Sequence, residues 1–106
     1  MVLLDYIANK GLRLPRESTS NPGLWRSMRA AAARAGVGAV FPATTQTGIL
    51  DDHTPFLNAG IPAIDLIDFS YRYADTTRDT VDKLSQRSLD AVGEATLELL
   101  RGRRAR

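Results

Sequence analysis

Residues 51–56, DDHTPF, place two carboxylates directly before His53, the only histidine among the 106 residues. A carboxylate and an imidazole this close together can share protons or bind a metal ion. Thr54-Pro55 is also typical of a helix start, where carboxylates satisfy free backbone N–H groups. The segment therefore predicts either an acid–base or metal-binding role for Asp51 and His53, or a helix anchor.

Other acidic residues lie within or after apolar runs of the chain. Asp5 interrupts the run 2–7, Asp65 and Asp68 lie in the run 61–69, and Asp75 follows in a polar stretch. Ligands of parallel α/β sheets bind outside the carboxyl ends of the strands. We therefore expect Asp5, Asp51, Asp68 and Asp75 to lie near such ends, and we expect Asp65 to pair with an arginine.

The elements that would position these residues follow from the apolar spacing and from the helix start and stop signals. Strands alternating with helices predict an α/β fold with a mostly parallel sheet. The predicted strands are 2–7, 37–41 and 61–69, the predicted helices are 21–36, 54–60 and the stretch from residue 85 onward, and loops are predicted at 16–20, 42–48 and 70–80.

Composition narrows the class of protein. An apolar content of 43% and a charged content of 25% are ordinary for a globular domain, and no apolar run is long enough to predict a membrane-spanning helix. The absence of cysteine excludes disulfides and thiolate metal sites and leaves the compartment open.

The predicted division is one domain over 1–100 and a basic tail over 101–106. The tail has four arginines but no aromatic residue, so nucleic-acid binding is not predicted.

Three blocks of the chain resemble one enzyme family. Residues 51–64 are similar to the Asp-Asp-His-x-Pro-Phe-Leu segment, with its following Gly-Ile-Pro and strand, of the M28 peptidases, which include zinc aminopeptidases and glutaminyl cyclases. Residues 75–84, DTTRDTVDKL, resemble the family element His-Thr-x-x-Asp-Thr-x-Asp-Lys-Leu, and residues 2–5 resemble a family strand that ends in Asp. The resemblance implies a three-layer α/β/α sandwich, of which this chain is the C-terminal half.

The same resemblance implies roles for single residues. Asp5 matches a metal ligand of the two-zinc peptidases, or a member of the acidic network of the cyclases, and Asp51 matches a carboxylate of the cyclase proton network. Asp75 stands where the family has its last histidine ligand, which makes it the second predicted metal residue. Asp51, Asp5 and His53 are the predicted catalytic residues, although bonding to a neighbouring carboxylate or to the backbone is the simpler role for His53.

Other parts of the family site are absent from the sequence. There is no His-x-Asp and no Glu-Glu pair, and the three glutamates, Glu17, Glu94 and Glu98, are isolated. Zinc is therefore expected of the intact family enzyme rather than of this chain, and the chain alone is predicted to be inactive on the peptide N-termini that the family uses as substrates. The predicted partner is a second copy or the missing N-terminal half. A non-catalytic module that binds itself or a partner, and a structural domain without ligand, remain as alternatives.

Overall fold

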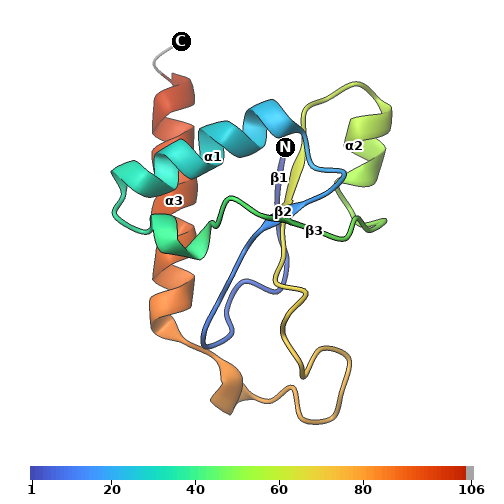
Figure 1. The fold of residues 1–106 in the computed structure, drawn as a ribbon, viewed down its shortest axis with the longest axis vertical. Helices are drawn as coiled ribbons and strands as arrows, with labels where there is room; N and C mark the ends of the chain where they lie inside the picture. Colours follow the sequence, from blue (N-terminus) through green and yellow to red (C-terminus); the bar gives the residue numbers. More distant parts are fainter. Residues whose placement is uncertain (105–106) are drawn as a thin grey trace.

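Short parallel strands alternate with helices in the computed structural model, which describes residues 1–104 (Figure 1). In chain order the elements are β1 (Val2–Leu4), β2 (Arg16–Glu17), α1 (Pro22–Arg34), the 3-10 helix η1 (Gly38–Val40), β3 (Thr45–Gln46), α2 (Thr54–Asn58), β4 (Ile64–Leu66), the 3-10 helix η2 (Val81–Lys83) and α3 (Gln86–Arg104). This is the predicted α/β class.

Both strand pairs are parallel. β1 pairs with β4, with Val2 opposite Ile64, and β2 pairs with β3, with Arg16 opposite Thr45. The residues after β2 run along the other side of β4, because the backbone N–H of Asn21 donates to the carbonyl of Ala63 over 2.9 Å. The strands lie between α3 and α2 in the view of Figure 1. The backbone N–H of Arg13, before β2, donates to the side chain of Asp68, after β4, so β2 runs in the opposite direction to β4, whereas the carboxyl ends of β1 and β4 lie side by side.

Helices α1 and α3 pack against each other beside the strands. As predicted, α1 begins at Pro22, and the side chain of Asn21 accepts a hydrogen bond from the N–H of Leu24 over 2.8 Å. Apolar residues from both helices and from the strands are buried together, and their burial from water is the main stabilising contribution. The core contains Leu12, Leu14, Leu24, Trp25, Met28, Ala31, Ala32, Phe41, Ile64, Leu66, Val92, Ala95 and Leu99.

Several predicted strands differ from the structure. The predicted strand 37–41 is wrong: it forms η1, which turns Phe41 into the core against Trp25, with the ring centroids 5.9 Å apart. A short apolar run fits a strand or a helical turn equally well. The predicted strand 2–7 ends at Leu4 because Tyr6 adopts a positive φ of 51°. The loops predicted at 16–20 and 42–48 contain β2 and β3.

The last helix extends into the predicted basic tail. Ser85 precedes α3, and its hydroxyl accepts a hydrogen bond from the N–H of Ser88. The helix runs to Arg104, so residues 101–104 of the tail are helical, whereas residues 105–106 lie outside the described part of the chain. None of the helices in residues 1–104 combines the length and the apolar character that crossing a membrane requires.

Candidate active site

His53 lies at the centre of a buried polar cluster. It directly precedes α2 and is fully buried, as is Glu17 at the end of β2. Its Nε2 atom lies 3.2 Å from Oε1 of Glu17 and 2.9 Å from the hydroxyl of Thr19. On the other side of the ring, Nδ1 lies 3.6 Å from Oδ2 of Asp65. The imidazole is therefore held between two carboxylates from different strands.

Glu17 is a member of this cluster that the sequence analysis missed. Its carboxylate accepts hydrogen bonds from the N–H of Ile49 over 2.8 Å, from the hydroxyl of Thr19 over 2.8 Å and from that of Ser20 over 3.0 Å. Burial by itself would raise the pKa of Glu17, but these donors outweigh it and lower the pKa. Glu17 is therefore an anion in the folded chain. The only sequence signal is the hydroxyl-rich run 18–20 that follows it.

Asp65 occupies the middle of β4 and is fully buried. The expected pairing with an arginine is wrong, since the neighbours of its carboxyl group in the described structure are His53 and Asp51. Neither of its carboxyl oxygens receives a hydrogen bond from a donor in the described residues. Burial, followed by the contact with Asp51, raises the pKa of Asp65 to about 8. A protonated Asp65 is a hydrogen-bond donor rather than an isolated buried charge.

Asp5 and Asp51 complete a group of three acids with Asp65. Burial, and next a hydrogen bond with the side chain of Asp51, raises the pKa of Asp5 to about 6. For Asp51, burial would raise the pKa, but hydrogen bonds from Asp65, from the N–H of Asp52 and from Asp5 outweigh it and lower the pKa. Asp51 is therefore the first of the three acids to lose its proton as the pH rises. The structure thus brings together the predicted residues Asp5, Asp51 and His53 and adds Asp65 and Glu17 to them.

The structure places Asp75 outside this group, on an exposed loop between β4 and η2. Its carboxylate accepts a hydrogen bond of 3.3 Å from the hydroxyl of Tyr6, the residue that follows Asp5. Asp75 has a positive φ of 59°, as Tyr6 has one of 51°. Such backbone conformations cost energy in residues other than glycine, although aspartate adopts them more readily than most.

The described residues do not form a zinc site by themselves. Zinc sites in proteins use at least three side-chain ligands. No three His, Asp or Glu side chains within residues 1–104 are grouped in a way that could hold a metal ion. The metal-binding roles of Asp5 and Asp75 stay predictions.

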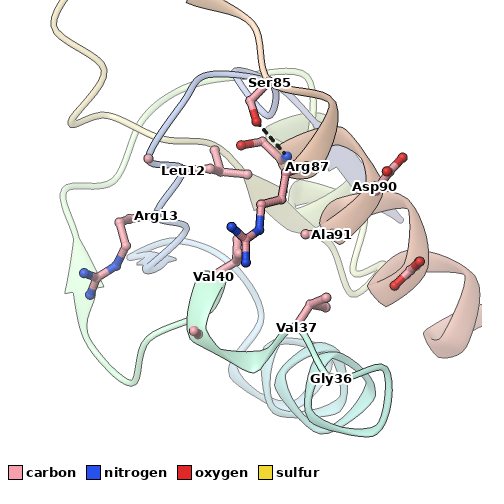
Figure 2. A pocket seen from close by; sticks show the side chains of 13 residues that line it. Leu12, Arg13, Gly36, Val37, Val40, Ser85, Arg87, Asp90 and Ala91 are labelled. Atoms are coloured by element: carbon pink, nitrogen blue, oxygen red, sulfur yellow. Dashed lines mark hydrogen bonds between the residues drawn. The ribbon is translucent and has the colours of Figure 1, made fainter.

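A separate cavity of about 840 Å³ lies between residues 11–13, η1 and the start of α3. Figure 2 shows Leu12, Val37, Val40 and Ala91 around it, with the guanidinium group of Arg87 extending across it. None of the clustered acids and no part of His53 lines this cavity. This cavity is therefore separate from the buried polar cluster around His53.

Comparison with known proteins identifies the family. The model of peptidase family M28 matches residues 1–100. The chain belongs to peptidase family M28. This confirms the resemblance seen in the three sequence blocks. No curated protein sequence matches the chain.

Solved structures of the M28 fold superpose closely on this chain. The glutaminyl cyclase of an Acidobacteriales bacterium is 36% identical, with a TM-score of 0.85 over 94% of this chain and 37% of its own. A leucine aminopeptidase precursor from Bacteroides thetaiotaomicron is 27% identical, with a TM-score of 0.84 over 92% and 36% of the two chains. A Zn-dependent exopeptidase from Parabacteroides distasonis is 25% identical, with a TM-score of 0.84 over 92% and 37%. The chain thus spans less than half the length of each of these relatives.

Proposed function

We propose that this chain supplies the acid–base carboxylates of an M28 active site of the glutaminyl cyclase type. The observation that carries the proposal is the buried setting of Asp5 beside Asp51, in which burial and next the side-chain hydrogen bond with Asp51 raise the pKa of Asp5 to about 6. Cyclisation of an N-terminal glutamine removes a proton from the α-amine and delivers one to the departing ammonia. A carboxyl group with a pKa near the working pH can do both in turn.

Cyclases at 36%, 35% and 32% identity support the cyclase branch, while two further cyclases are 25% and 28% identical. The chain is 36% identical to the Acidobacteriales cyclase and 27% identical to the aminopeptidase precursor. Zinc, which the family implies, supplies polarisation of a carbonyl oxygen when bound. In this proposal its remaining ligands come from outside residues 1–104, because the described residues hold no complete metal site. The chain alone is therefore expected to be inactive.

A chimaera tests the proposal. Residues 1–100 replace the matching segment of the Acidobacteriales cyclase, and ammonia release from a peptide with N-terminal glutamine is measured. We expect the chimaera to be active and the isolated chain to be inactive. Asp5→Asn and Asp51→Asn in the chimaera should each lower kcat by about 10²-fold or more, as loss of an acid–base group does.

Asp90→Asn is the matched control, because Asp90 lies exposed on α3 and an asparagine there can still accept the hydrogen bond from Gln86. This variant should keep full activity. If neither Asp5→Asn nor Asp51→Asn lowers kcat of the chimaera, these residues are excluded from the acid–base step. Turnover by the isolated chain would contradict its expected inactivity.

The free edge of β1 favours self-association as a second candidate function. In the described structure β1 has β4 as its one neighbouring strand. Met1 and Asp5 make the backbone bonds to β4, so the alternate residues Val2 and Leu4 direct their N–H and C=O groups away from it. Leu4 is 45% exposed, and Leu100 of α3 is 52% exposed. An apolar strand edge of this kind can pair with a second copy.

Sedimentation equilibrium of the isolated chain should then give an average mass that rises with concentration from that of one chain towards that of two. A mass of one chain at all concentrations would exclude the second candidate.

A further inference from the structure

The ring of His53 is fixed by the hydrogen-bonding capacity of its neighbours. Glu17 is ionised, and an ionised carboxylate only accepts hydrogen bonds. The atom 3.2 Å from Oε1 of Glu17, Nε2 of His53, must therefore carry a proton. On the other side of the ring, Nδ1 faces Oδ2 of Asp65 at a distance of 3.6 Å. Glu17 thereby determines both the tautomer and the orientation of the imidazole.

Fixing His53 also fixes Asp51, two residues earlier in the same turn. The carbonyl of Asp51 accepts the N–H of Thr54 over 3.0 Å, and the hydroxyl of Thr54 accepts the N–H of Asp51 over 3.2 Å. The carbonyl of His53 accepts the N–H of Leu57 and so joins the turn to α2. A shift of the imidazole would therefore move the backbone that carries Asp51.

Glu17 joins a third segment to this arrangement. Its Oε2 atom accepts the N–H of Ile49, in the loop that leads from β3 to Asp51. The carboxylate of Glu17 thus binds the backbone on the N-terminal side of Asp51, and the imidazole of His53 lies on its C-terminal side. Two buried polar groups are a costly way to fill a core, since apolar groups of the same size often give equal or greater stability. The benefit of Glu17 and His53 in the core is then that they fix the positions of the groups around them.

We propose that Glu17 and His53 form a buried positioning pair that holds the turn 51–54 so that the carboxylate of Asp51 meets Asp5. All contacts that form this pair lie within the chain. Its importance for catalysis rests on the proposed function of Asp5 and Asp51. Neither Glu17 nor His53 needs to touch a substrate in this role.

Nuclear magnetic resonance of the isolated chain at neutral pH tests the pair directly. The ring ¹⁵N signals of His53 should show one species with a proton on Nε2. In Glu17→Gln the charge that holds this proton is removed, so the two tautomers should mix. A wild-type ring without a proton on Nε2 would overturn the proposal, and this outcome can be read without any variant.

The backbone N–H of Asp52 gives a second signal, because it donates to Oδ1 of Asp51 over 2.8 Å and so reports where that carboxylate lies. Its resonance should shift in Glu17→Gln and in His53→Leu. His53→Gln should restore most of it, because the glutamine amide can donate to Glu17 as Nε2 does. Glu94→Gln, on the exposed side of α3, is the matched control and should leave it unchanged. An unshifted Asp52 resonance in Glu17→Gln would contradict the pair.

The chimaera separates the two proposals. Glu17→Gln should lower kcat there and leave KM unchanged, since the pair positions an acid–base group and does not bind substrate. If the chimaera itself is inactive while the His53 and Asp52 signals behave as expected, the proposed function fails and the positioning pair stands. If the chimaera is active and Glu17→Gln changes neither kcat nor those signals, the pair fails alone.

Discussion

Asp65 is held in the strand β4 between two buried apolar residues, Ile64 and Leu66. A charged carboxylate at such a place is costly unless it is paired. Asp65 avoids that cost by retaining its proton, which it can donate to Asp51. The same proton makes the stability of the whole chain depend on pH.

The sign of that dependence follows from the raised pKa of Asp65. The folded chain binds the proton up to a pH of about 8, whereas the unfolded chain releases it near pH 4. The free energy of unfolding should therefore fall as the pH rises from 4 to 8, by about 2–4 kcal/mol. Asp5, with a pKa of about 6, adds to the lower part of this range. The lowered pKa values of Glu17 and Asp51 act in the opposite direction, at pH values below 4.

Urea denaturation of wild type and Asp65→Asn at pH 5 and pH 8 measures this effect. The asparagine can still donate to Asp51 but cannot ionise, so most of the difference between the two pH values should disappear. Asp90→Asn, on the exposed side of α3, should retain the wild-type difference. If wild type and Asp65→Asn lost the same stability between pH 5 and pH 8, Asp65 would not be the titrating group.

At the same scale, the sequence identifies the residues whose neighbours in the chain form a pattern. Asp51 and His53 stand in one segment, and Asp5 ends an apolar run, so all three could be chosen as candidates. Glu17 and Asp65 could not be, because each meets His53 only after the fold brings the segments together. Glu17 is 36 positions from the histidine that it contacts.

The turn after β2 and the loop after β3 approach each other closely at Gly48. A Cβ atom at Gly48 would lie 2.5 Å from the hydroxyl of Ser18 and 2.9 Å from a methyl group of Thr19. Thr19 cannot move away freely, because its hydroxyl contacts both Glu17 and His53. The close approach places the N–H of Ile49 on Glu17.

Gly48→Ala should therefore destabilise the chain by about 1–3 kcal/mol through overpacking. Gly93→Ala is the matched control, because Gly93 lies within α3 and a Cβ atom there would meet nothing within 4 Å. It should stabilise the chain by about 0.5–1 kcal/mol, the usual gain from alanine in a helix. Thermal denaturation followed by circular dichroism measures both, and equal effects of the two alanines would contradict the close packing at Gly48.

The helices could be predicted from their end signals, whereas the short strands could not. Asn21-Pro22 starts α1 in the sequence and in the structure. β2 and β3 have two residues each, too few for an alternating pattern, and tertiary contacts alone create them. Because Glu17 lies in β2, the missed strand and the missed buried acid have the same cause.

In the molecule as a whole, the outer side of β1 has no neighbouring strand in the described structure. A cavity of about 470 Å³, lined by Val2, Ile61 and Leu100 among others, lies beside it. Apolar surface next to unpaired backbone groups favours a further strand, whether from a second copy or from the remainder of an M28 domain. The family resemblance predicted a second copy or the missing N-terminal half as the partner, whereas composition and spacing could predict only the α/β class.

Leu4→Lys should weaken self-association, because a charge on an edge strand opposes pairing with another chain. We expect the dissociation constant from sedimentation equilibrium to rise at least tenfold. Leu50→Lys is the control, since Leu50 is 89% exposed and belongs to the loop between β3 and α2 rather than to β1, so the same charge change there should leave association unchanged. Equal weakening by both lysines would indicate a general charge effect.

The pairing of β1 with β4 also has a consequence for the order in which the chain folds. The amino group of Met1 donates to the carbonyl of Pro62, 61 positions away. At a synthesis rate of about 5–20 residues per second, β1 waits for about 3–12 s before β4 has been made. Contacts between such distant segments also form slowly, because a long loop must close before they gain any stability. During that interval β1 has no partner strand, so its apolar residues stay available for contacts with other chains.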